Sequence, residues 1–261
     1  LTFTEHHSTL ATILDVWDLL MNKTDKIYVA GHNGMVGSAI MRQLIEDGYS
    51  HVFGASHMDV DLRNQIATDR YFELAQPDYV FLAAARVGGI LSNDTYRAEF
   101  IYDNLMIEVN VIHAAYKNNV KKLIALGSSC IYPKAYVRPL KEEDLLSGYL
   151  EPTNEPYAVA KIAGIKLCEA YRDQYGCNFI SIMPPNLYGK GDRYGTDSTH
   201  VVPSLIRRFH EAKINNLPTV TVWGTGSPFR EFMYTDDLAD ACIFLMNNYD
   251  EKLFVNAGTG E

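Results

Sequence analysis

The chain has 261 residues, and a soft prior of about 150 residues per domain allows one large domain or two interlocked ones. It carries 23 Lys and Arg residues against 32 Asp and Glu residues, a formal net charge of −9. This acidic balance argues against indiscriminate nucleic-acid binding. A composition that is 47 % hydrophobic and 21 % charged excludes wholesale disorder, collagen and coiled coil.

The apolar segments are too short for a membrane helix. The longest clean apolar run, Tyr79–Ala85, falls well short of the roughly 20 residues that such a helix needs, so no membrane span is expected. The four cysteines include no CxxC pair, which favours reduced thiols in a cytoplasmic protein. We expect no metal site.

The first residues show a helical pattern of their own. Apolar residues recur at three- and four-residue steps between Leu10 and Met21, a spacing that predicts one face of a helix. No basic segment precedes them, so a secretory signal is not expected. We expect residues 1–22 to form a helical leader that either docks a partner or covers part of the body.

From Lys26 onward, short apolar runs alternate with longer helical patterns. The predicted strands are Ile27–Ala30, His51–Ala55, Tyr79–Ala85, Lys122–Gly127 and Phe179–Met183. The predicted helices are Met35–Glu46, Ala98–Lys117 and Tyr157–Tyr175. Such alternation predicts an α/β fold, a Rossmann-type doubly wound parallel sheet with helices on both faces.

The composition changes after residue 185 and divides the chain into regions. Residues 186–230 are rich in Gly, Pro, Asn and Thr around one amphipathic stretch, Val201–Ala212. We therefore expect a dinucleotide-binding domain over 23–185 and a smaller substrate-binding region inserted over 186–230. Residues 231–261 are expected to return to the first domain.

A glycine-spaced turn joins the first predicted strand to the first predicted helix. Gly31, Gly34 and Gly37 have the spacing GxxGxxG. In such a turn the glycines allow a tight bend, a close approach to a pyrophosphate and close packing of helix on strand, and the helix dipole attracts the phosphates. The cofactor-binding residues expected here are Gly31, Asn33, Gly34, Met35, Val36 and Gly37.

The end of the second predicted strand determines which dinucleotide is expected. An acidic side chain there would bind the ribose hydroxyls of NAD and repel the extra phosphate of NADP. The stretch from Val52 to His57 offers no carboxylate, and Ser56 and His57 are suited to a phosphate, so NADP(H) is the expected cofactor. Asp61 and Leu62 are expected either to border the adenine or to lie in an exposed loop.

A tyrosine and a lysine share one face of the third predicted helix. Tyr157 and Lys161 are about one helical turn apart. A neighbouring ammonium stabilises the phenolate and lowers the pKa of a phenol from about 10 toward the working range. Ser128 follows the strand that ends at Gly127, at the sheet edge where ligands bind in α/β folds. These residues predict acid–base chemistry at a substrate carbonyl.

Six sequence blocks carry a resemblance to a known family. They are residues 31–37, 83–90, 127–134, 151–161, 198–203 and 222–231, and together they span about residues 26–261. The block from Gly127 to Lys134, Gly-Ser-Ser-Cys-Ile-Tyr-Pro-Lys, is far more specific than the glycine loop. On these residues the chain resembles the extended short-chain dehydrogenase/reductases, most closely the members that make a GDP-linked deoxysugar.

The resemblance implies a two-step reaction on a nucleotide sugar. The substrate would be GDP-4-keto-6-deoxy-D-mannose, which is epimerised at C3 and C5 and then reduced at C4 with NADPH. Cys130 and His200 match the family's base and acid for the epimerisation. Tyr157 would protonate the C4 oxygen, Ser128 would polarise it in both steps, and Lys161 would also hold the nicotinamide ribose.

The resemblance also assigns further contacts. It adds Ala84 and Pro184 to the cofactor-binding residues and implies a homodimer through the two long helices Ala98–Lys117 and Tyr157–Tyr175. Arginine is favoured at the nucleotide end because it binds phosphate with two parallel hydrogen bonds. A core role explains Trp223 nearly as well as substrate binding. The substrate-binding positions are Asn186, Arg208, Trp223 and Arg230.

The chain departs from the family's usual pattern at several places. Pro185 stands where threonine is usual, and Lys190–Tyr194 replaces a histidine–aspartate pair followed by an aromatic loop. Asn33 and His57 stand where some members have arginine, which weakens the preference for NADP. The chain also stops before the family's usual end, so we expect an incomplete substrate-binding region.

Two other functions remain open at this point. One is another nucleotide-sugar epimerase or dehydratase of the same family, although a dehydratase would need a carboxylate that Ser128–Lys134 lacks. The other is a non-catalytic dinucleotide-binding module, which the leader and the short C-terminus favour. The intact Ser128, Tyr157 and Lys161 argue against such a module.

Overall fold

A computed structural model describes residues 20–260 of the chain, except residues 136–138, 196–198, 223 and 228. The predicted leader therefore lies almost entirely outside the described residues. Of its last residues, Leu20 is partly exposed and Met21 is buried in the core. Within the described residues, no helix is both long enough and apolar enough to span a membrane.

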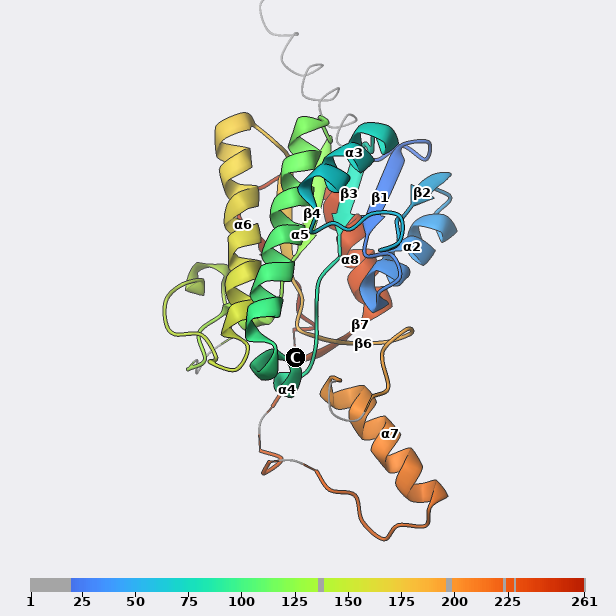
Figure 1. Cartoon of the computed structure of the whole chain (residues 1–261), viewed down its shortest axis with the longest axis vertical. Helices are drawn as coiled ribbons and strands as arrows, with labels where there is room; N and C mark the ends of the chain where they lie inside the picture. Colours follow the sequence, from blue (N-terminus) through green and yellow to red (C-terminus); the bar gives the residue numbers. More distant parts are fainter. Residues whose placement is uncertain (1–19, 136–138, 196–198, 223, 228, 261) are drawn as a thin grey trace, which may run out of the picture.

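A six-stranded parallel sheet forms the centre of the molecule (Figure 1). The strand order is β2-β1-β3-β4-β5-β8, so the chain reverses its direction of winding between β1 and β3. The parallel pairing is continuous, as in the register that sets Ile27 of β1 opposite Tyr79 of β3. The strands are β1 (Lys26–Ala30), β2 (His51–Phe53), β3 (Tyr79–Leu82), β4 (Lys122–Leu126), β5 (Phe179–Met183) and β8 (Val255–Asn256).

Helices cover both faces of this sheet, and the side chains of β1 show why. Ile27 and Val29 point into a core with α2 and α8, whereas Tyr28 and Ala30 point into a core with α3, α5 and α6. The central strands are buried on both faces and therefore read as continuous apolar runs. The covering helices are α2 (Met35–Glu46), α3 (Gln65–Ala75), α5 (Arg97–Lys117), α6 (Glu155–Tyr175) and α8 (Thr235–Asn248).

The remaining elements lie at one end of the sheet. A second, two-stranded parallel sheet pairs β6 (Asn186–Tyr188) with β7 (Phe232–Tyr234). Between these strands the chain forms α7 (Val201–Ile214), which stands away from the main body at the lower end of Figure 1. The short elements at this end are α4 (Ile90–Thr95) and the 3₁₀ turns η1 (Ser129–Ile131) and η2 (Glu142–Asp144).

The predicted fold class, a doubly wound α/β sheet, is confirmed, and the differences are local. β3 ends at Leu82 rather than Ala85. The next residues, Ala83 and Ala84, lie against the backbone of Gly31 in the glycine loop. Three described helices, α3, α4 and α8, are not among the predicted elements, although α3 and α8 carry sequence signals. Asn64 caps α3 by accepting a hydrogen bond from the Ala67 N–H. α8 buries apolar residues at helical spacing, among them Leu238, Cys242 and Met246.

Close packing of α2 on the glycine loop leads to a test of the fold. A β-carbon on Gly37 would lie 2.2 Å from the carbonyl oxygen of Gly31, a contact that backbone atoms cannot relieve without shifting. We therefore expect Gly37→Ala to lower the free energy of unfolding by about 1–3 kcal/mol, as overpacking does. Thermal unfolding followed by circular dichroism measures this loss.

Ser38→Ala is the matched control, because it changes the next residue of α2 without adding volume. It should melt within a degree or two of the wild-type chain. Equal melting temperatures for Gly37→Ala and Ser38→Ala would contradict the close approach of α2 to the loop.

Candidate active site

The carboxyl ends of the parallel strands meet at one edge of the sheet, where the chain reverses its winding. Gly31, with φ +85°, follows β1, and a β-carbon on it would lie 2.6 Å from the backbone nitrogen of Ala84, which follows β3. Only glycine fits such a contact at a positive φ. The structure thus brings Gly31 and Ala84 together at the point where ligands bind in open α/β sheets.

The N-terminus of α2 points toward this edge without a side-chain cap. Its N-cap is Gly34, which has no side chain that could cap the helix, and the first turn holds no acidic residue. The N–H groups of Met35, Val36 and Gly37 are therefore left for an outside acceptor. This arrangement fits the diphosphate of a dinucleotide, since such a helix end attracts anions. Asn33, just before the cap, is exposed.

Ser128 and Cys130 lie at the end of β4. The Ser128 hydroxyl oxygen accepts a 3.4 Å hydrogen bond from the Cys130 N–H, and the backbone N–H of Ser129 donates to the carbonyl oxygen of Pro184 after β5. Burial raises the pKa of the Cys130 thiol to about 11, while a hydrogen bond from Ser128 and the charge of Lys161 oppose the rise. The resting thiol is therefore protonated at neutral pH.

The ammonium of Lys161 lies in the same group and is buried. Its Nζ donates to Oε1 of Glu108 at 2.6 Å and to the carbonyl oxygen of Leu126, the last residue of β4, at 2.8 Å. Both side chains of the ion pair are only 3 % exposed. Burial raises the pKa of the Glu108 carboxyl, and the Lys161 charge opposes this rise.

Tyr157 completes the group from the first turn of α6. Its ring lies 6.0 Å from Nζ of Lys161 and edge-on to the ring of Phe100, with 6.4 Å between the two ring centroids. Burial raises the pKa of the Tyr157 phenol well above its usual value, and the Cys130 and Glu108 side chains raise it further. The structure thus holds the phenol protonated and gathers four of the five predicted catalytic residues, Ser128, Cys130, Tyr157 and Lys161.

Sequence reasoning missed Glu108, and a signal for it existed. Glu108 falls on the buried stripe of α5, between Asn104 and Val111, where a carboxylate needs a partner. Space for it comes from Gly164 of α6, because a β-carbon there would lie 2.2 Å from Oε2 of Glu108. The pattern marks an unusual position, but it does not identify the partner.

The turn after β2 engages Ser56, one of the two side chains expected to meet the phosphate of NADP, within the chain itself. The stretch up to His57 holds no carboxylate, but the turn brings Asp59 back, and its Oδ2 accepts hydrogen bonds from both N–H and Oγ of Ser56. The donors of Ser56 are thus occupied by an acidic group, which lies near His32 of the glycine loop. His57 itself is exposed. Its expected contact with a phosphate stays a prediction.

Asp61 is also engaged within the chain. Arg63 binds both of its carboxylate oxygens at 2.9 Å and reaches Oδ1 of Asp103 at 3.2 Å, and Arg86 binds Oδ2 of Asp103 at 2.9 Å. These hydrogen bonds hold the pKa of Asp61 below its usual value. Leu62 is buried among the residues of the α3–α5 face. The negative charge of Asp61 is thus balanced by Arg63.

Of the residues predicted for the substrate, Asn186 begins a strand of the second sheet and Arg208 lies on α7. Asn186 donates from Nδ2 to the carbonyl oxygen of Glu231 at 3.1 Å, and Arg208 of α7 donates to that of Thr221 at 3.3 Å. Arg230 is exposed, and Trp223 lies outside the described residues. His200 is the exposed N-cap of α7, and the described residues show no hydrogen bond between its ring and Ser128, Cys130 or Tyr157. Its catalytic role stays a prediction.

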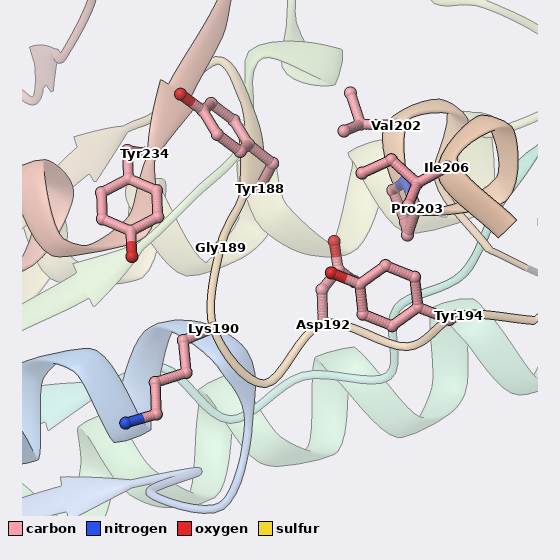
Figure 2. Close-up of a pocket in the computed structure, with 9 residues that line it drawn as sticks. All are labelled: Tyr188, Gly189, Lys190, Asp192, Tyr194, Val202, Pro203, Ile206 and Tyr234. Carbon is pink, nitrogen blue, oxygen red and sulfur yellow. The ribbon is translucent and has the colours of Figure 1, made fainter. Parts of the chain in front are cut away.

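A cavity of about 320 Å³ opens between the second sheet and α7 (Figure 2). Its wall combines aromatic and charged side chains, and the rings of Tyr188 and Tyr234 lie 5.5 Å apart. None of the predicted catalytic residues lines it. The lining residues are Tyr188, Gly189, Lys190, Asp192, Tyr194, Val202, Pro203, Ile206 and Tyr234. Apart from Tyr234, all of them fall in the region expected to bind substrate.

No group of three or more His, Cys, Asp or Glu side chains is placed to hold a metal ion among the residues that the structure describes.

Comparison with known proteins identifies the family. The sequence profile of the NAD dependent epimerase/dehydratase family matches residues 27–258. The chain belongs to this family. The resemblance on the six sequence blocks is thereby confirmed. Among curated members, GDP-L-fucose synthase 1 of Arabidopsis thaliana is 54 % identical over 242 residues, which are 93 % of this chain and 75 % of that protein.

Solved structures of family members agree with the fold. A GDP-L-fucose synthetase from Naegleria fowleri bound to NADP is 30 % identical, with a TM-score of 0.85 over 93 % of this chain and 79 % of that one. MlghC, a GDP-mannoheptose C4 reductase from Campylobacter jejuni with NADP bound, is 38 % identical. Its TM-score is 0.86 over 92 % of this chain and 82 % of that one.

The environment of Cys130 predicts slow and strongly pH-dependent alkylation. Raising the pKa of a thiol from 9.0 to about 11 lowers its thiolate fraction at neutral pH about a hundredfold. We expect iodoacetamide to label Cys130 about a hundred times more slowly than glutathione at pH 8, with a rate that rises up to about pH 11. Peptide mass spectrometry follows the labelling.

Ser128→Ala tests the cause of this behaviour. It removes the hydrogen bond that lowers the pKa of Cys130 and should slow the labelling further at each pH. Labelling that stops rising near pH 8 would contradict the buried, protonated thiol.

Proposed function

We propose that the chain is a GDP-L-fucose synthase-type enzyme, which epimerises GDP-4-keto-6-deoxy-D-mannose at C3 and C5 and reduces it at C4 with NADPH. The proposal rests on one observation above all. Ser128, Cys130, Tyr157 and Lys161 form a single group at the carboxyl edge of the sheet, beside a helix N-terminus suited to a diphosphate. A close relative named GDP-L-fucose synthase 1 and a GDP-L-fucose synthetase structure bound to NADP support it.

The reduction uses the hydroxyl groups of Ser128 and Tyr157. When NADPH is bound, it supplies a hydride to C4 of the sugar. The protonated phenol of Tyr157 gives its proton to the C4 oxygen, which completes the alcohol, and the Ser128 hydroxyl donates a hydrogen bond to the same oxygen. Lys161, fixed by Leu126 and Glu108, keeps a positive charge beside the phenol as the proton leaves.

The epimerisation uses the same oxygen. Cys130 acts as a thiolate, so its thiol first loses its own proton to solvent. The thiolate then takes the proton from the carbon beside the C4 ketone, and His200 as the acid returns a proton to that carbon from the opposite face of the ring, while the Ser128 hydroxyl donates a hydrogen bond to the enolate oxygen. The region 186–230, which includes Asn186, Arg208 and Arg230, would hold the nucleotide end of the substrate. The cavity between α7 and the second sheet lies in this region.

A second candidate function is reduction at C4 of a GDP-sugar without epimerisation. It is favoured by the protonated state of the Cys130 thiol and by the exposed position of His200. A relative of this chain carries the name GDP-mannoheptose C4 reductase. Both candidates share the reducing group and differ only in whether Cys130 and His200 move protons.

One incubation separates the proposals. The protein is mixed with NADPH and GDP-4-keto-6-deoxy-D-mannose in deuterium oxide, and the product is identified by nuclear magnetic resonance. The proposed function predicts GDP-L-fucose with deuterium at C3 and C5. A reduced product without deuterium there would establish the C4 reductase, and the lack of any turnover would exclude both.

Two variants divide the steps between side chains. Tyr157→Phe removes the proton donor, so we expect at least a hundredfold loss of NADPH oxidation with deuterium exchange retained. Cys130→Ser removes the base, so exchange at C3 and C5 should be lost while NADPH oxidation continues. Normal deuterium incorporation in Cys130→Ser would remove Cys130 from the mechanism. The wild-type chain, assayed in parallel, provides the reference for both steps.

We further propose that the chain acts as a homodimer in the cytoplasm, with α5 and α6 at the interface. The two helices pack side by side (Figure 1), and their outer face carries the exposed apolar side chains of Tyr102, Val109 and Val159. Exposed apolar residues that follow one face of a helix favour a protein contact. The free cysteines support a reducing compartment.

Light scattering at micromolar concentration should give twice the chain mass of 29.4 kDa. Val109→Lys should shift the mass toward the monomer, because it places a charge in the interface. Leu74→Lys, on the exposed side of α3, is the control and should leave the dimer intact. A wild-type monomer would overturn the assignment.

A further inference from the structure

Glu108 is a buried carboxylate at the centre of the site. Neither the proposed reduction nor the proposed epimerisation uses this carboxylate. Its Oε1 accepts a 2.6 Å hydrogen bond from Nζ of Lys161, and both side chains are 3 % exposed. A buried ion pair is weak evidence for stability, because removing two charges from water costs about as much as their attraction returns. A reason other than stability is therefore needed for this pair.

The geometry shows how Glu108 constrains Lys161. Two of the three N–H groups of the ammonium are directed to Glu108 on α5 and to the Leu126 carbonyl on β4. Tyr157 lies close to the same ammonium, with its ring centroid 6.0 Å from Nζ. With two anchors on different elements, the ammonium cannot swing away from the reacting group.

The surroundings of Glu108 are shaped for this contact. Gly164 of α6 faces it, and a β-carbon at that position would lie 2.2 Å from Oε2 of Glu108. The titratable groups that face the pair are Tyr157, Cys130 and Cys168. None of these three groups is a carboxylate, so among the described residues Glu108 is the carboxylate that balances the ammonium.

We propose that Glu108 is a positioning residue of the reduction: it holds the Lys161 ammonium charged and aligned beside Tyr157. The inference rests on the proposed function and deepens it, because it assigns a role to a side chain that touches neither substrate nor cofactor. A buried ammonium needs a partner of opposite charge to offset its loss of hydration. Without Glu108, Lys161 would thus lose its counter-ion and one of its two anchors.

A double-mutant cycle tests whether Glu108 acts through Lys161. Glu108→Gln keeps the shape and removes the charge, and we expect it to lower kcat for NADPH oxidation about tenfold to a hundredfold, with the KM for NADPH changed by less than about threefold. In a Lys161→Met background, the same change should have no further effect on kcat. Additive losses, or an unchanged kcat for Glu108→Gln, would overturn the proposal.

Two further variants make the result decisive. Glu169→Gln removes the carboxylate of the exposed Lys166–Glu169 pair on α6, at 2.7 Å, and should leave kcat unchanged. If Glu108→Gln does not fold, the cycle is run with Glu108→Asp. This variant keeps the charge on a shorter side chain and should lower kcat only when Lys161 is present.

A wild-type chain without turnover would overturn the proposed function, and with it the role of Glu108. An active wild-type chain with additive losses would overturn the role of Glu108 alone.

Discussion

One buried cation holds the candidate active site together. Lys161 comes from α6, but its ammonium is fixed by the carbonyl of Leu126 at the end of β4 and by Glu108 of α5. The ammonium therefore joins three elements that are distant in sequence, α5, α6 and β4. Ser128 is the second residue after β4, and Tyr157 lies one turn before Lys161, so the hydroxyl and the phenol are placed by the same anchor. Because the cation is buried, its position depends on the fold and not on solvent.

The cofactor side of the edge depends on backbone contacts instead. Gly31 meets Ala84 across the point where the winding reverses, and Gly37 meets Gly31, so neither position has room for a side chain. These contacts bring the free N–H groups of α2 to the edge where β4 presents Ser128. A dinucleotide bound at the helix end and a ketone bound at Ser128 are then neighbours. The fold supplies this proximity through sterics, before any side chain of the site takes part.

The part of the site that follows from strand order could be predicted from sequence, and the part that follows from side-chain direction could not. Apolar runs locate the strands, and parallel strands must end at one edge, so Gly31 and Ser128 are predictable neighbours. The return of Asp59 onto Ser56 depends on a turn of four residues that has no apolar pattern. The pairing of Glu108 with Lys161 joins two helices whose rotation is set only by packing. A helical period shows that Glu108 is buried but not what it meets.

The two halves of the proposed reaction are built on different kinds of structure. Ser128, Tyr157 and Lys161 belong to the packed edge of the main sheet, and the proposed reduction uses these three side chains. His200 is the exposed first residue of α7, which stands away from that sheet, so the returning proton must come from a separate region (Figure 1). Relatives named as a synthase and as a C4 reductase share the same fold. In the proposed mechanism, changes at Cys130 and around α7 would add or remove epimerisation, while Ser128, Tyr157 and Lys161 stay the same.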